Sequence, residues 1–102
     1  MKASSLKKIA DAVPSFRKRN AMKYAETVNL DKFYIALEAA AANGKYSATL
    51  YTIQLIEDGY FTPNDDFDQK HFLLLFANKL ESAIEGLNTQ VIDGGINISW
   101  GA

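Results

Sequence analysis

The stretch from Asn88 to Trp100 reads Asn-Thr-Gln-Val-Ile-Asp-Gly-Gly-Ile-Asn-Ile-Ser-Trp and decides the fold. Two short runs, in which apolar and polar residues alternate, flank Asp-Gly-Gly. This pattern is typical of a β-hairpin, because a glycine supplies the positive φ that a tight turn requires. In the second run Ile96 and Ile98 fall on one face of the strand, and polar residues fall on the other. The pattern predicts strands near 88–92 and 96–100.

A third strand is expected near residues 46–53. This run follows a Gly-Lys turn and is rich in β-branched and aromatic residues, which favour strands. The pattern leaves open whether the strand continues through residues 54–56 or gives way there to a short helical turn. If the run pairs beside the hairpin, the sheet reaches the three strands that independent stability usually demands.

Two segments with helical periodicity, 30–43 and 66–86, complete the predicted domain. Asn29 can cap the first helix, and Gly44 can end it in the left-handed conformation. Acidic residues precede the second helix and can cap it in the same way. The chain is therefore predicted to be an α+β domain in which these two helices cover one face of a small three-stranded sheet.

The N-terminal region is expected to form two separate helical pieces. Residues 4–13 place apolar side chains at positions i, i+3, i+4 and i+7, which favours a short amphipathic helix. Pro14 is predicted to end this helix, because the residue before a proline is driven out of the α region. A second, weakly amphipathic piece follows. We predict a basic helical arm over 1–26 and a single α+β domain over 27–102.

Charge is distributed unevenly along the chain. The net charge of −1 combines seven bases and one acid in residues 1–24 with four bases and eleven acids in the rest. A basic arm on an acidic body suggests a polyanion, an anionic surface or an acidic protein patch as its partner. The alternative is that these bases form only a solvated helix face. The candidate binding residues are Lys7, Lys8, Arg17, Lys18, Arg19 and Lys23.

Two aromatic residues lie among these bases. Phe16 and Tyr24 alternate with positive charge, a combination that single-stranded nucleic acid uses through stacking and phosphate contacts. Tyr24 could equally anchor the arm to the domain. We expect residues 1–24 to carry any polyanion binding and to be removable with the fold intact.

Composition excludes several classes of protein. The 102 residues, 48% of them hydrophobic, are typical of one globular domain. Without cysteine, the chain has no disulfide framework, thiolate nucleophile or cysteine-containing zinc site. It also has no run near the ~20 apolar residues of a membrane span, and its start lacks the apolar core of a signal peptide. We therefore expect neither secretion nor membrane insertion.

Candidate catalytic and metal-binding residues are few. His71 is the only histidine, and a helical histidine alone lacks the second ligand or base that such sites need. The acidic residues of 64–68 do not form a calcium loop, because Lys70 and His71 stand where that loop requires an acceptor and a glycine. The glycines form no phosphate-binding loop. We expect no cofactor, no metal and no catalytic residue.

The segment 87–100, with residues 41–50 upstream, resembles a pattern found in small, mostly uncharacterised proteins of tailed bacteriophages. Those proteins have an alanine-rich helix, a Tyr/Ser-rich strand, a further helix and a closing Ile-Ser-Trp, which stands here at 98–100. The resemblance covers roughly residues 30–100 and gives the basic first 24 residues no counterpart.

The resemblance implies a viral origin and a non-enzymatic role in the virion or the host cytoplasm. The chain would be a minor virion component or a binder of a phage or host protein. Self-association through a sheet edge is possible, because exposed edges pair readily and Trp100 is expected to lie beside one. A nucleic-acid-binding accessory protein that uses residues 1–24 is the second hypothesis. An enzyme with a site around His71 is the third.

Overall fold

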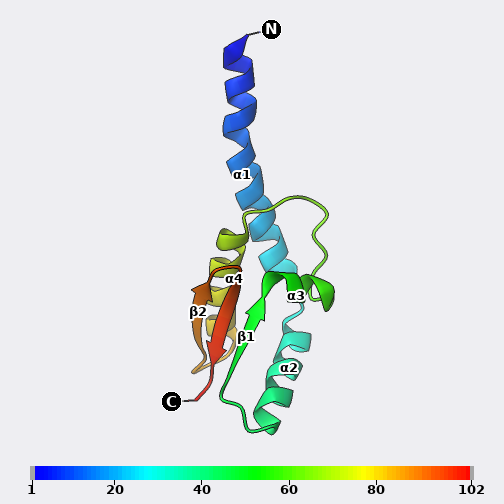
Figure 1. Cartoon of the computed structure of the whole chain (residues 1–102), viewed down its shortest axis with the longest axis vertical. Coiled ribbons are helices and arrows are strands. Elements are labelled where there is room, and N and C mark those ends of the chain that lie inside the picture. The colour runs from blue at the N-terminus through cyan, green and yellow to red at the C-terminus, as the bar shows by residue number, and fades with distance from the viewer. Residues whose placement is uncertain (1, 102) are drawn as a thin grey trace.

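The computed structural model describes residues 2–101, which form an α+β domain with a protruding helix (Figure 1). In this range the elements are α1 (Ala3–Thr27), α2 (Leu30–Ala42), β1 (Ser47–Tyr51), α3 (Thr52–Glu57), α4 (Gln69–Ala83), β2 (Asn88–Ile92) and β3 (Gly95–Ser99). The predicted fold class is confirmed: a three-stranded sheet is combined with two main helices, α2 and α4.

The sheet is antiparallel throughout, in the order β1-β3-β2. Ile96 of the central strand β3 lies between Leu50 of β1 and Val91 of β2. Gly94, with a φ of +73°, makes the hairpin turn. The hairpin and the pairing of the third strand beside it are therefore confirmed. Trp100 follows the central strand, so the expectation that it lies beside a sheet edge is wrong.

The two faces of the sheet differ in polarity. Ile96 and Ile98 of β3 are buried toward the helices. On the other face, the Thr49 hydroxyl donates a hydrogen bond to Asn97 Oδ1 at 2.6 Å. This alternation follows from the period of two along a strand and fixes which face the helices cover.

Strand β1 ends at Tyr51, two residues before the predicted end at 53. The backbone N–H of Tyr51 donates to Gln54 Oε1 at 3.1 Å, which caps a short helix, α3. As a result Thr52 and Leu55 are buried in the domain. The local side-chain cap outweighs the strand propensity of Thr52 and Ile53, and the helical alternative is the correct one.

Side-chain caps set the start of both main helices. Asn29 Oδ1 accepts a hydrogen bond from the Lys32 backbone N–H at 3.0 Å, and Asp68 Oδ1 accepts one from the His71 backbone N–H at 3.0 Å. Both caps satisfy N–H groups that the helix itself leaves free. Helix α2 matches its predicted range closely, whereas α4 is three residues shorter than the predicted 66–86 at each end. Residues 66–68 belong to a loop bound to α1, and the extended backbone of Ile84 ends the helix.

Aromatic rings from four segments form the centre of the core. The rings in contact are Tyr24, Phe33, Tyr60, Phe61, Phe67, Phe72 and Phe76. Phe72 of α4 is fully buried and stacks on Phe61, with the ring centroids 4.7 Å apart. It also contacts Phe67 and Phe76. The core therefore depends on α4 and on the loop that precedes it.

Helix α1 continues through Pro14, so the predicted helix break is wrong. Proline removes one N–H donor, and its ring crowds the carbonyl of the residue four positions earlier, here Ala10. Ala10 is exposed, and water can therefore hydrate the carbonyl that loses its helical partner. The result is one helix of 25 residues in place of two separate pieces.

The last turns of α1 belong to the core. Ala21, Tyr24 and Ala25 are buried, and this part of α1 packs beside α4. Removing residues 1–24 would therefore take Ala21 and Tyr24 out of the core, which argues against the expectation that this segment can be removed with the fold intact. The first half of α1 extends beyond the body, which gives the molecule principal dimensions of 62 × 24 × 20 Å (Figure 1).

Candidate functional site

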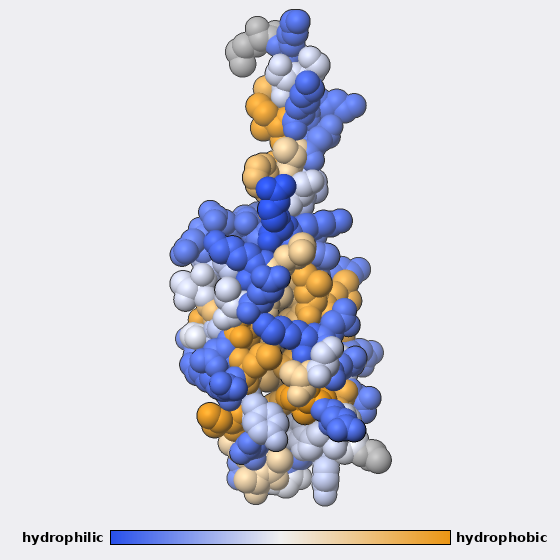
Figure 2. Space-filling model, turned by 180° about the vertical axis from the view of Figure 1, so that it is seen from behind, coloured by the Kyte–Doolittle hydropathy of each residue, from blue (hydrophilic) through white to orange (hydrophobic). Residues whose placement is uncertain are grey.

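The protruding half of α1 carries a row of exposed apolar side chains, which we call the apolar stripe: Leu6, Ile9, Val13 and Phe16. These residues are spaced by three or four positions, so they lie on one flank of the helix. Each is between 48% and 66% exposed. Figure 2 shows hydrophobic surface along one flank of the protruding helix and hydrophilic surface along the other.

The continuity of α1 extends this stripe. With a break at Pro14, Phe16 would belong to a second piece with a poor apolar face. In one unbroken helix it lies three residues after Val13 and continues the same flank. The sequence pattern finds Leu6, Ile9 and Val13, but Phe16 joins them only because the helix passes through the proline.

Five of the six predicted binding residues lie on α1 outside the apolar stripe, and we call them the basic face: Lys7, Lys8, Lys18, Arg19 and Lys23. All five are exposed. Lys7 and Lys18 are eleven residues apart, as are Lys8 and Arg19, and eleven residues return a helix to nearly the same direction after about three turns. Lys7 and Lys18 therefore share one direction on α1, and Lys8 and Arg19 share another. Arg19 borders the apolar stripe, because its guanidinium carbon lies 5.4 Å from the centroid of the Phe16 ring.

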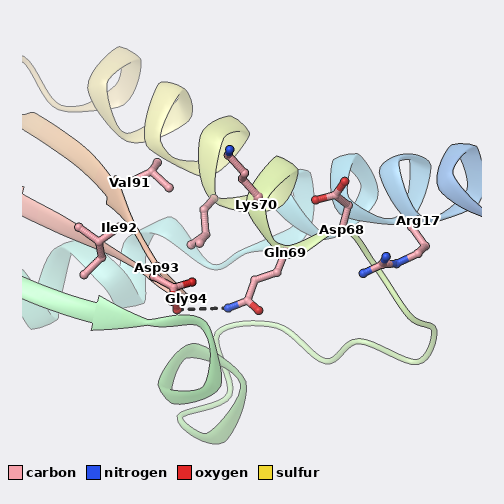
Figure 3. Close-up of a pocket in the computed structure, with 9 residues that line it drawn as sticks. Arg17, Asp68, Gln69, Lys70, Val91, Ile92, Asp93 and Gly94 are labelled. Atoms are coloured by element: carbon pink, nitrogen blue, oxygen red, sulfur yellow. Dashed lines mark hydrogen bonds between the residues drawn. The ribbon is translucent and has the colours of Figure 1, made fainter.

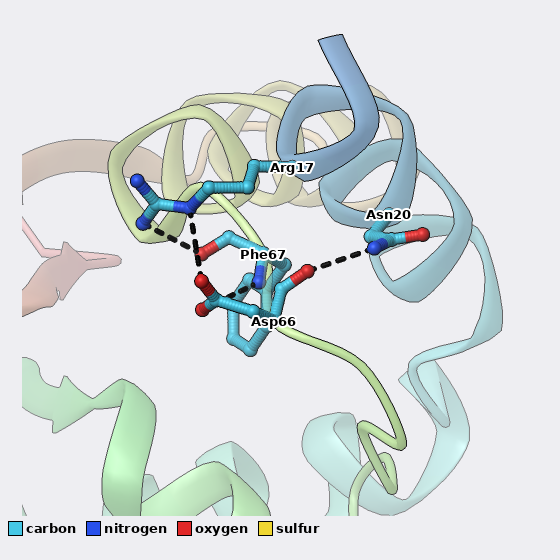
Figure 4. A network of polar contacts seen from close by, with 4 residues as sticks. All are labelled: Arg17, Asn20, Asp66 and Phe67. Carbon is cyan, nitrogen blue, oxygen red and sulfur yellow. Dashed lines mark hydrogen bonds and ion pairs between the residues drawn. The ribbon is translucent and has the colours of Figure 1, made fainter. Parts of the chain in front are cut away.

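Arg17, the sixth predicted residue, has a structural partner. Its Nε lies 3.3 Å from Asp66 Oδ2, and its Nη2 donates to the Phe67 carbonyl at 3.3 Å (Figure 4). Asn20 Nδ2 donates to the Asp66 carbonyl at 2.8 Å. Both charged groups of the ion pair are exposed and so contribute little stability individually. Together these contacts hold the loop before α4 against α1.

Tyr24 anchors the same loop. Its hydroxyl accepts hydrogen bonds from the backbone N–H groups of Asn64 and Asp65, each at 3.0 Å. Because the ring is buried, it cannot stack on a nucleic acid base. Of the two interpretations of Tyr24, anchoring is therefore correct, and Phe16 is the exposed ring of the pair.

A hollow of about 520 Å³ lies between the start of α4 and the β2–β3 turn (Figure 3). Its lining includes two bases, Arg17 and Lys70, and two acids, Asp68 and Asp93. Gln69 Nε2 donates to the Gly94 carbonyl across it at 3.2 Å. The formal charges of these four side chains cancel.

His71 lies half-buried on α4, and its backbone N–H is bound by the Asp68 cap. The lining of the hollow beside it does not include its side chain. Among residues 2–101, no three histidine or acidic side chains lie close enough together to hold a metal ion. The acidic residues before α4 act on the helix and the loop: Asp68 caps α4, and Asp66 pairs with Arg17.

None of the helices described over residues 2–101 combines the length and apolar character needed to cross a membrane. No protein-family model, curated protein or solved structure matches this chain.

Proposed function

We propose that this chain is a non-enzymatic interaction protein that binds a protein partner through the apolar stripe of α1. The observation that carries the proposal is the row of large apolar side chains exposed on a helix that extends away from its own domain. Helices in water gain most of their stability by packing an apolar face, and the protruding half of α1 leaves this face unpacked. Its spacing matches the i, i+3, i+7 anchors with which amphipathic helices enter apolar grooves.

The biological setting of this proposal comes from the resemblance to tailed-bacteriophage proteins. In that setting the chain is a minor virion component or a binder of a phage or host protein, and it acts in the virion or the host cytoplasm. The stripe supplies the contact in either case.

Replacing the stripe with polar residues should abolish partner binding. We expect a Leu6→Gln/Ile9→Gln/Val13→Gln chain to keep its helix, because glutamine is a good helix former, but to lose apolar area at the contact. The matched control is Lys7→Gln/Lys8→Gln/Lys18→Gln, with three changes on the basic face. The measurement is affinity capture from phage-infected cells, quantified by mass spectrometry.

Proteins retained by the wild type and the lysine control but lost by the stripe variant support the proposal. Equal capture by all three chains contradicts it. Circular dichroism of both variants checks that the helical content of α1 is unchanged.

Nucleic-acid binding through the basic face is the second candidate. The alignment of Lys7 with Lys18 and of Lys8 with Arg19 favours it, because these exposed bases can follow one phosphate backbone. Each phosphate contact on duplex DNA contributes about −0.9 to the slope of log K against log salt concentration. We therefore expect a steep salt dependence that becomes shallower in the lysine variant and is unchanged in the stripe variant.

Binding to single- and double-stranded DNA and RNA at several salt concentrations tests this candidate. A flat salt dependence, or equal slopes in the lysine variant and the wild type, would exclude it. The two variants therefore separate the two candidate functions on the same helix.

A further inference from the structure

A groove with an apolar floor and an acidic rim lies at the end of the body opposite the protruding half of α1. It consists of two adjoining hollows, of about 170 and 490 Å³, which share Tyr34 and Ile84. Helix α2 forms one wall, and the residues that follow α4 form the other, together with Trp100. We call it the α2/α4 groove.

The floor of the groove is mainly apolar, with Leu37, Leu87 and Trp100 contributing to the smaller hollow. This hollow, at about 170 Å³, is below the ~300–1,000 Å³ of typical small-molecule sites, whereas the adjoining hollow of about 490 Å³ lies within that range. The two adjoining hollows can accept successive apolar side chains of a docked helix. Ala41 also lines the smaller hollow, and this small residue allows another element to approach α2 closely.

The charged residues that line the groove are all acidic: Asp31, Glu38 and Glu85. All three are exposed. A partner that fits must therefore bring an apolar stripe accompanied by positive charge. Helix α1 has both, because Arg19 lies beside the stripe with its guanidinium carbon 5.4 Å from the centroid of the Phe16 ring.

We propose that the α2/α4 groove binds the apolar stripe of α1 from a second copy of this chain. This inference rests on the proposed function, because it names the partner of the same stripe. Charge complementarity supports it: the arm and the body have opposite charge, and the acids of the body include the three on this rim.

The dimensions of the two surfaces also match. The stripe from Leu6 to Phe16 spans about 15 Å of helix, and the α2 wall from Leu30 to Ala41 spans about 16 Å. A chain cannot fill its own groove, because the protruding end of α1 and helix α2 lie at opposite ends of the molecule (Figure 1). The occupant must therefore come from another molecule.

An antiparallel pair of chains makes this contact twice. When two elongated copies lie side by side in opposite directions, each protruding helix lies beside the α2 end of the other copy. Such an arrangement has two-fold symmetry and closes without forming a filament. Two equivalent contacts also double the apolar area that stabilises the dimer.

Cross-linking between chains tests the contact directly. The natural chain has no cysteine, so each introduced thiol is unique. We would mix a Val13→Cys chain with a mass-tagged Ala41→Cys chain and add a short bis-maleimide cross-linker. We expect the mixed product to exceed both products of like chains, because the stripe of one copy faces the groove of the other. The proposal would be overturned if the mixed product were no more abundant than the amount expected from random collision of the two chains.

Sedimentation equilibrium of the full chain supplies a second, independent measurement. Ala41→Lys places a base in the groove and should weaken dimerisation about tenfold or more, because the lysine loses hydration and repels the basic arm. Ala39→Lys is the matched control, since this exposed residue lies on another side of α2 and does not line the groove. It should leave the dimer unchanged.

The outcomes separate this inference from the proposed function. A dimer that the stripe variant disrupts but Ala41→Lys does not would overturn the groove and keep the stripe as the binding surface. A chain that stays monomeric but captures another protein through its stripe would likewise overturn only self-docking. Both proposals would be overturned if neither variant affected the dimer and the stripe variant captured the same proteins as the wild type.

Discussion

Replacing Phe72 with alanine should lower the free energy of unfolding by about 3–5 kcal/mol, as is usual for truncation of a buried phenylalanine. A domain of this size is stabilised by roughly 5–15 kcal/mol in total, so the variant should be marginally stable. The ring is fully buried and contacts Phe61, Phe67 and Phe76, and alanine would leave a cavity among them. Urea unfolding followed by circular dichroism measures the loss.

Phe16→Ala is the matched control, because it removes the same side chain from an exposed position of the apolar stripe. We expect it to change stability by no more than about 0.5 kcal/mol in the monomer. If the two variants lost equal stability, the assignment of Phe72 to the core and of Phe16 to the surface would be wrong.

Local signals in the sequence predicted most of the domain. The Asp-Gly turn with Gly94 at positive φ and the caps at Asn29 and Asp68 each depend on residues within a few positions of one another. Their effects are therefore readable from spacing alone. The main helices and the hairpin follow from these signals together with the hydrophobic period.

The N-terminal helix could not be predicted in the same way, because its structure depends on distant residues. Arg17 and Asn20 bind the loop at 66–67, and Tyr24 binds the same loop two residues earlier. These contacts join segments about 40 to 50 positions apart, which no local pattern reveals. They fix the second half of α1 as a helix, and the first half continues from it through Pro14.

The candidate site shows the same division between local and distant signals. The basic residues and most of the apolar stripe are visible in the sequence, because they repeat along one helix. The α2/α4 groove is not, since Trp100 and Ile84 meet Tyr34 only after the sheet and both helices have assembled. Opposite charge on arm and body was the only trace of complementarity that the sequence carried.

Two deletions should separate the binding and structural parts of α1. Deleting residues 2–13 removes only exposed and half-exposed residues, so we expect a cooperatively folded body whose stability changes by about 1 kcal/mol or less. Deleting residues 2–24 also removes Ala21 and Tyr24 from the core, and with them the anchor of the loop before α4. We expect this chain to be largely unfolded, as judged by thermal melts and amide NMR dispersion.

The shorter deletion also tests function, because it removes Leu6, Ile9 and Val13 while leaving the body intact. It should abolish every contact that depends on these three residues without a loss of fold, which separates a binding defect from a folding defect. A cooperatively folded chain lacking residues 2–24 would contradict the structural role of Tyr24. The arm would then be separable near residue 24, where the chain changes from basic to acidic. Helix α1 would contribute to binding but not to the core.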